Sequence, residues 1–185
     1  MTTKTTFALC AAASAFMLAS AGPSLAKDPM VGGAPMYASK NIIQNAVHSK
    51  DHTTLVAAVK AAGLVSTLEG KGPFTVFAPT NQAFAKLPKG TVSTLLKPEN
   101  KAKLADILTY HVIPGRLTAR DLEMKVKEGH GHTMLKTVEG KDLTFSDRGK
   151  MLYVTDAKGD RARVTIANVM QSNGVIHVIN KVMIP

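Results

Sequence analysis

The segment most informative about the fold is Phe74-Thr75-Val76-Phe77-Ala78-Pro79-Thr80-Asn81-Gln82-Ala83-Phe84. Its first half is a short apolar run with proline on both sides, at Pro73 and Pro79, which is typical of a buried strand. Pro79 has no N–H to donate to a neighbouring strand, so the strand must end there. Thr80 or Asn81 can then accept hydrogen bonds from the free N–H groups of a helix that continues through Lys86. The segment therefore predicts a buried strand followed directly by a capped helix.

Helical spacing of apolar residues characterises the rest of the first half. Helices are expected over Asn41 to His48, from Asp51 or Thr53 to a C-cap at Gly63, and from an N-cap at Asn100 through Leu108. Thr118 and Asp121 resemble a capping box that opens a further helix.

Strand patterns characterise the second half, after a strand expected over Tyr110 to Ile113. Two runs flank the turn residues Glu139-Gly140 and predict a hairpin, with three more strands after it. The five expected strands are His132 to Val138, Leu143 to Ser146, Met151 to Thr155, Val164 to Val169 and Val175 to Ile184. Helices first and strands later predict an α+β fold.

Composition and the N-terminus place the chain outside the cytoplasm. The 185 residues are 45 % hydrophobic with 14 Gly and 9 Pro, which excludes collagen-like, coiled-coil and wholly disordered chains. Residues 1–26 have the pattern of a signal peptide: Lys4, an apolar run over Phe7 to Ala19, and small residues at Ser24-Leu25-Ala26 before the expected cleavage, with Ala19-Ser20-Ala21 as a second candidate. We expect a flexible leader over residues 27–36 and a single domain over 37–185, secreted or periplasmic and not an integral membrane protein. Cleavage would remove the single cysteine, Cys10, and would lower the formal charge from +10 to +9.

Two more segments have a recognisable pattern: Tyr110-His111-Val112-Ile113-Pro114-Gly115 and Asn173-Gly174-Val175-Ile176-His177-Val178-Ile179-Asn180. Together with residues 74–84, and in this order, they resemble the signature segments of the fasciclin family of extracellular modules. The single-domain exported form is similar to small bacterial fasciclin proteins. The resemblance implies a β-wedge or sandwich of about seven strands flanked by several helices, and a role in adhesion or surface interaction without catalytic chemistry. Asn180 departs from the family, which usually places Asp there.

Candidate binding residues come from the resemblance and from charge. Tyr110 and His111 match the family's tyrosine-histidine segment, which in animal members is linked to receptor recognition. The alternative is that His111 is a buried, hydrogen-bonded core residue. The alternation of side chains along a strand favours burial for His177 as well. The remaining candidates are Arg116 and Arg120, which belong to one of two basic clusters: Arg116, Arg120, Lys125 and Lys127, and Arg148, Lys150, Lys158, Arg161 and Arg163.

Such clusters outside the cell favour anionic partners, namely acidic polysaccharide, lipopolysaccharide or acidic lipid headgroups. A solvated surface that keeps the protein in solution is the alternative. Nucleic acid is disfavoured, because export and the lack of an aromatic platform argue against it.

No catalytic motif is present: the sequence lacks Gly-x-Ser-x-Gly, His-Glu-x-x-His, a phosphate loop and a dinucleotide fingerprint. We therefore expect no enzyme, no catalytic residue, no cofactor and no metal. The leading hypothesis is a non-enzymatic adhesion or interaction module that binds a surface protein or glycan. The alternatives are a periplasmic copper-handling protein, which would use the histidines of His130-Gly131-His132 and His48/His52 with Met30 and Met36, and a hydrolase of envelope substrates. The sequence leaves the oligomeric state open.

Overall fold

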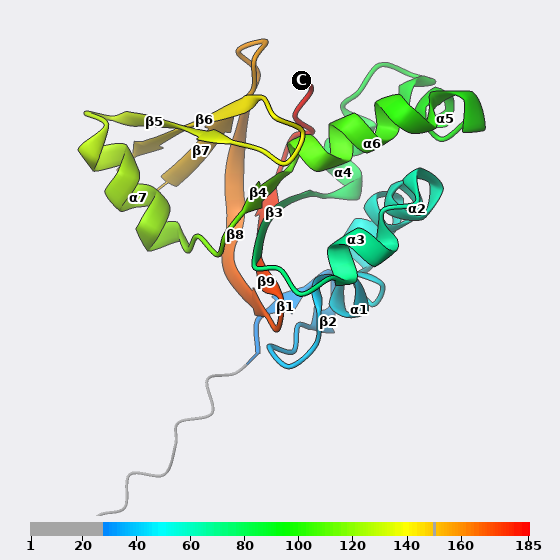
Figure 1. The fold of residues 1–185 in the computed structure, drawn as a ribbon, viewed down its shortest axis with the longest axis horizontal. Helices are drawn as coiled ribbons and strands as arrows, with labels where there is room; N and C mark the ends of the chain where they lie inside the picture. The colour runs from blue at the N-terminus through cyan, green and yellow to red at the C-terminus, as the bar shows by residue number, and fades with distance from the viewer. Residues whose placement is uncertain (1–27, 150) are drawn as a thin grey trace, which may run out of the picture.

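A seven-stranded sheet runs through the fold of the computed structural model, which describes residues 28–149 and 151–185 (Figure 1). The predicted signal peptide lies outside the described residues. In sheet order the strands are β4 (Val112–Pro114), β3 (Phe74–Pro79), β9 (Gly174–Ile179), β8 (Arg161–Gln171), β7 (Met151–Thr155), β6 (Asp142–Arg148) and β5 (His132–Lys136). The α+β prediction is thereby confirmed.

Strands β3 and β9 are parallel, whereas the other neighbours in the sheet are antiparallel. Strand β3 runs beside β9 in a continuous register from Phe74 opposite Gly174 to Pro79 opposite Ile179. Gly174 allows this close approach, because a Cβ atom there would overlap the carbonyl oxygen of Phe74. As predicted, the strand from residue 74 ends at Pro79.

Seven α-helices and two short 3₁₀ turns complete the described residues. They are α1 (Ile42–Ala46), η1 (Lys50–His52), α2 (Thr53–Ala62), α3 (Val65–Glu69), α4 (Asn81–Ala85), α5 (Thr91–Leu95), η2 (Pro98–Asn100), α6 (Lys101–Tyr110) and α7 (Ala119–Glu128). None of these helices is long and apolar enough to cross a bilayer.

Local capping signals were predicted correctly in several helices. Thr80 Oγ1 accepts a hydrogen bond from the Ala83 N–H at the start of α4. Thr118 and Asp121 form the expected capping box of α7, and Gly63 ends α2 with φ of 74°. Asn100 precedes α6 without capping it, because its side chain donates instead to the carbonyl oxygen of Thr94.

The N-terminus of α2 is capped from another helix. Neither Asp51 nor Thr53 supplies the cap that the sequence suggests. Instead, Oδ1 of Asn81 accepts from the Thr54 N–H at 3.0 Å, and Nδ2 of Asn81 donates to the Lys50 carbonyl oxygen and to Thr53 Oγ1. The first residue of α4 thereby ties α2 to the end of β3.

Alternating residues of β3 and β9 face two different cores, as the period of two requires. Val76, Ala78, Ile176 and Val178 pack against the helices α1 to α6. Phe77 and Ile179 pack on the opposite side, against α7 and the inner face of β6 to β8. Figure 1 shows these two layers on either side of β3 and β9.

The flexible leader predicted over residues 27–36 is wrong for its described part. Met30–Val31 (β1) and Ala34–Pro35 (β2) form a short antiparallel hairpin. Val31 and Met36 are buried in the helical core, and the Lys50 N–H donates to the Gly32 carbonyl oxygen. Buried apolar side chains therefore hold this segment on the domain, whereas its glycines and prolines alone had suggested a linker.

Asn173, in the turn between β8 and β9, joins three elements through one buried side chain. Its Oδ1 accepts from the Ile42 N–H at the start of α1, at 3.1 Å. Its Nδ2 donates to the carbonyl oxygens of Leu68 and Gly70, at 2.7 and 3.0 Å, at the end of α3. The turn residue thus satisfies backbone groups of two helices, a connection that no local sequence pattern predicts.

Replacing Asn173 should be costly because it removes three hydrogen bonds in a buried site. We expect Asn173→Ala to lower the free energy of unfolding by roughly 2–4 kcal/mol, measured by urea denaturation. Ser172→Ala, a change at the exposed neighbouring residue, is the control. A loss for Asn173→Ala no larger than that for the control would contradict this role.

Candidate functional site around Tyr110 and His111

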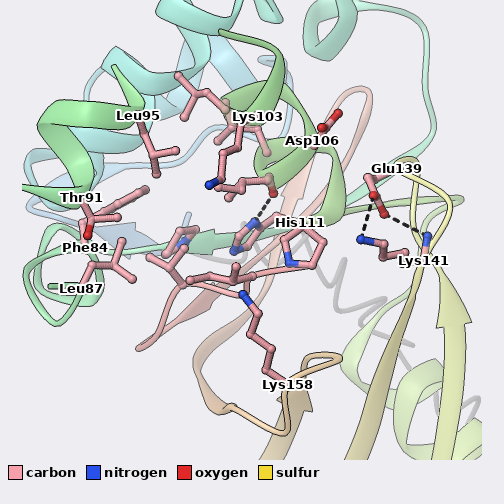
Figure 2. Close-up of a pocket in the computed structure, with 17 residues that line it drawn as sticks. Phe84, Leu87, Thr91, Leu95, Lys103, Asp106, His111, Glu139, Lys141 and Lys158 are labelled. Carbon is pink, nitrogen blue, oxygen red and sulfur yellow. Dashed lines mark hydrogen bonds and ion pairs between the residues drawn. The ribbon is translucent and has the colours of Figure 1, made fainter. Parts of the chain in front are cut away.

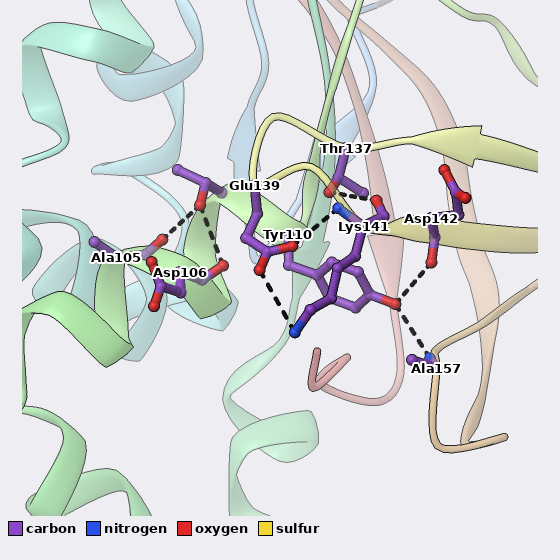
Figure 3. Close-up of polar contacts among 9 residues, drawn as sticks. Ala105, Asp106, Tyr110, Thr137, Glu139, Lys141, Asp142 and Ala157 are labelled. Carbon is purple, nitrogen blue, oxygen red and sulfur yellow. Dashed lines mark hydrogen bonds and ion pairs between the residues drawn. The ribbon is translucent and has the colours of Figure 1, made fainter.

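Tyr110 ends α6 with its side chain in the second core, and it is 0 % exposed. Its hydroxyl donates to the Asp142 carbonyl oxygen at 2.9 Å and accepts from the Ala157 N–H at 3.2 Å (Figure 3). Burial raises the pKa of this phenol, which stays protonated. Tyr110 therefore joins the helical layer to β6 and to the loop between β7 and β8.

His111 is also buried, with 3 % of its surface exposed, and both ring nitrogens bind backbone groups. Nδ1–H donates to the Ile107 carbonyl oxygen at 2.7 Å, and Nε2 accepts from the Met183 N–H at 3.0 Å. This pair of contacts requires the neutral ring with its proton on Nδ1. Burial lowers the pKa of His111 to about 4.

His177 in β9 also binds backbone groups through both ring nitrogens, but with the opposite tautomer. Its Nε2–H donates to the Leu117 carbonyl oxygen at 2.9 Å, and its Nδ1 accepts from the Asn168 N–H at 3.4 Å. The ring stacks on Phe77 with 5.4 Å between centroids, and burial lowers its pKa. The expectation that both histidines are buried, hydrogen-bonded core residues is confirmed.

The C-terminal segment after β9 is fixed beside His111 by buried polar contacts. Besides the Met183–His111 bond, the Ile184 N–H donates to Oδ2 of Asp156 at 3.0 Å. The other carboxylate oxygen of Asp156, which is itself buried, accepts from the N–H groups of Lys158 and Asp160. This carboxylate therefore orders the β7–β8 loop and the C-terminal segment together.

A cavity of about 440 Å³ lies between this C-terminal segment and the helices α4 to α6, and His111 forms part of its wall (Figure 2). Most of its lining is apolar, with charged side chains at its edge. The apolar lining includes Phe84, Leu87, Leu95, Leu104, Ile107, Val182 and Ile184, and the charged residues are Lys103, Asp106, Glu139, Lys141 and Lys158. No local sequence pattern predicts this cavity, because its walls come from helices and a C-terminal segment that are distant in the chain.

The four predicted binding residues do not form one surface. Tyr110 and His111 are buried, so neither ring is presented to a partner. Arg116 is exposed but donates to the carbonyl oxygens of Gln171 and Ser172, both at 3.1 Å. Arg120 is exposed on α7. A binding role for any of the four stays a prediction.

The histidine pairs considered for copper differ in their exposure to solvent. His52 is buried with Nδ1 2.8 Å from Ser49 Oγ, whereas His48 is exposed. His130 and His132 are both exposed near the end of α7. Across residues 28–149 and 151–185, no three side chains of His, Cys, Asp or Glu gather into a possible metal site.

The second basic cluster lies largely on the solvent side of β5 to β8, which we call the outer sheet face. Strand registers align His132, Ser146, Tyr153 and Arg163 in one row and Met134, Thr144, Thr155 and Arg161 in the next. Lys136 and Arg148 extend the face, and Asp142 is its acidic residue. The arginines of this face were part of the predicted basic cluster, but Lys136 and Tyr153 were not. The alternation of side chains along β5 and β7 would have placed both on the same face. Lys150 lies outside the described residues.

Asn180 keeps a role that a carboxylate could also perform. Its Oδ1 accepts from the Arg163 N–H at 2.8 Å and so extends the pairing of β8 with the end of β9. Oxygen is the acceptor in both Asn and Asp, so this bond survives the change from the family's usual residue.

Comparison with solved structures places the fold among FAS1 domains. The structure matches that of a FAS1 domain pair from the insect cell adhesion molecule fasciclin I, with a TM-score of 0.71, 16 % sequence identity, and coverage of 79 % of this chain and 51 % of that chain. The family model for the fasciclin domain matches residues 50–185, and the chain belongs to the fasciclin family.

Curated relatives agree with this assignment. Protein sll1483 of Synechocystis sp. is 48 % identical over 160 residues, which cover 86 % of this chain and 81 % of that protein. Immunogenic protein MPB70 of Mycobacterium bovis is 30 % identical over 200 residues, covering 98 % and 94 %. Transforming growth factor-beta-induced protein ig-h3 of Sus scrofa is 39 % identical over 131 residues, which span 71 % of this chain but 17 % of that much longer protein.

The buried histidines make stability depend on pH. His111 stays neutral in the fold down to about pH 4, whereas its ordinary value of 6.5 applies when the chain unfolds. The unfolded state therefore binds more protons as the pH falls, and stability present above about pH 6.5 is lost towards about pH 4. We expect His111 to account for about 3 kcal/mol of this loss.

The check is urea denaturation of the wild type and His111→Gln across this pH range. The free energy of unfolding of the variant should fall less steeply with decreasing pH than that of the wild type. His48→Gln, the same change at an exposed histidine, is the control. Equal slopes for the wild type and His111→Gln would contradict a buried neutral ring.

Proposed function

We propose that the protein is a non-enzymatic, extracytoplasmic adhesion module that binds an acidic surface polysaccharide through its outer sheet face. The observation that carries this proposal is the arrangement of cations on that face. Lys136, Arg148, Arg161 and Arg163 are exposed there, against the carboxylate of Asp142. Such a surface attracts a polyanion and holds it by several weak contacts.

The neighbouring side chains suit sugars better than an acyl chain. The guanidinium of Arg161 lies 5.4 Å from the ring centroid of Tyr153, so an aromatic ring sits between cationic neighbours. The hydroxyl of Ser146 lies in the same row of the sheet as Tyr153, and those of Thr144 and Thr155 lie in the next row. Successive outward residues on one strand are about 7 Å apart and neighbouring strands about 5 Å, a regular lattice that fits a repeating polymer.

The absence of catalysis is supported by the use of the signature side chains. The hydroxyl of Tyr110 and both ring nitrogens of His111 and His177 are engaged by backbone groups. Groups held this way have no free lone pair or proton to exchange with a substrate. The extracytoplasmic location rests on the predicted signal peptide, and the insect protein of the same fold is a cell adhesion molecule.

Binding to an acidic polysaccharide such as alginate, with neutral dextran as reference, tests the proposal. We expect Arg161→Ser/Arg163→Ser to weaken alginate binding about tenfold at low salt, since two exposed ionic contacts contribute roughly 0.7 kcal/mol each. Added salt should weaken the wild type more than this variant, because fewer charge contacts remain to be screened.

The matched control is Arg120→Ser/Lys127→Ser, which removes two exposed cations from α7. It should bind alginate within about twofold of the wild type. Weaker alginate binding by the α7 variant alone would show that the polysaccharide contacts α7. Equal binding of alginate and dextran by the wild type would show that charge does not drive the interaction. Either result would contradict the proposal.

A further inference from the structure

The cavity beside His111 is separate from the outer sheet face and is not used by the proposed function. Its volume of about 440 Å³ lies within the range of roughly 300–1,000 Å³ that is usual for small-molecule sites. Helices α4, α5 and α6 form one side, and residues after β9 form the other. The bonds from Met183 to His111 and from Ile184 to Asp156 fix that second side in place.

The interior of the cavity is suited to hydrocarbon. The lining is mostly apolar and includes the side chains of Phe84, Leu87, Leu95, Leu104 and Ile107. His111 adds no free polar atom, because the Ile107 carbonyl and the Met183 N–H occupy its two nitrogens. A water molecule needs two to four polar partners, so this part of the cavity favours an apolar occupant.

Charged groups gather toward the other end of the cavity. Figure 2 shows Phe84, Leu87 and Leu95 on one side of His111, and Glu139, Lys141 and Lys158 away from them. Glu139 is engaged by Lys141, through the ammonium group at 3.6 Å and the backbone N–H at 3.1 Å.

Two cations of the lining remain available: Lys158, and Lys103 beside Leu95 (Figure 2). Lys103 and Lys158 form no ion pair with any acidic side chain among the described residues. Asp106 is the other carboxylate of the lining and is exposed. Each of these two ammonium groups can pair with an anionic headgroup.

We propose that this cavity binds a free fatty acid: one acyl chain among the leucines of α5 and α6, and its carboxylate between Lys103 and Lys158. The shape, the apolar interior and the cationic edge are matched by this one ligand class. Burial of the chain supplies the affinity, and the two ammonium groups orient the head.

Chain length is the first variable of the test. Displacement of an environment-sensitive fluorescent fatty acid from the whole protein measures affinity for unlabelled acids from octanoate to palmitate. Affinity should rise about fourfold for each added methylene, and level off once the chain fills the cavity. The methyl ester of the best acid should bind about tenfold more weakly, because it cannot pair with the ammonium groups. Affinity that is independent of chain length, or equal for acid and ester, would overturn the proposal.

A substitution that fills the cavity is the second variable. Leu95→Trp places a large side chain in the cavity from α5, and Ser93→Trp adds the same side chain to α5 at an exposed position outside the lining. We expect Leu95→Trp to weaken binding at least tenfold and Ser93→Trp to leave it unchanged, with thermal unfolding recorded for both. Lys103→Met/Lys158→Met should remove most of the preference for acid over ester. Unchanged binding by a folded Leu95→Trp, or an unchanged preference in the lysine variant, would refute this site.

Discussion

The parallel pairing of β3 with β9 is the constraint around which the molecule is organised. Both strands are buried on both faces, so every backbone group along them must find a partner within the protein. Their register brings Phe74 beside Gly174, a residue a hundred positions later. The rest of the chain has to cover two faces, and it does so with the helices α1 to α6 on one face and with α7 and β6 to β8 on the other.

The signature segments serve this pairing at its two ends. Asn173 connects the turn before β9 to the helices α1 and α3. At the opposite end, His111 connects α6 to the backbone that leaves β9. His177 reaches from the middle of β9 to Leu117, ahead of α7. Because these polar groups are saturated by the backbone, the segments that identify the family act as structure, and the surfaces around them remain free to recognise other molecules.

Local signals in the sequence were sufficient for many elements but not for the contacts between them. Pro79 and Thr80 predicted the end of a strand and the start of a helix because both effects act within a few residues. The cap of α2 by Asn81 could not be predicted in this way, since it depends on where α4 packs. The hairpin over residues 30–35 was missed because its stability comes from Val31 and Met36 entering a core built by distant helices.

The candidate sites show the same division. Burial of His177 could be predicted from its apolar neighbours in an alternating strand. The basic cluster could be recognised from its arginines and lysines in the sequence. The cavity was not visible, because its lining combines α4, α5, α6 and the last residues of the chain, and no single segment carries its pattern. Tyr110 and His111 were candidates for a binding surface through the family resemblance, with a buried His111 as the alternative, and the end of α6 places both side chains in the interior.

The histidine tautomers offer the most direct test of whether the signature segments have a structural role. Imidazole ¹⁵N chemical shifts, recorded while the pH is lowered, identify which nitrogen carries the proton and when a second proton binds. We expect a proton on Nδ1 of His111 and on Nε2 of His177, with His111 remaining neutral until about pH 4. A His111 ring that exchanges between tautomers, or gains a second proton near its ordinary value of 6.5, would contradict it.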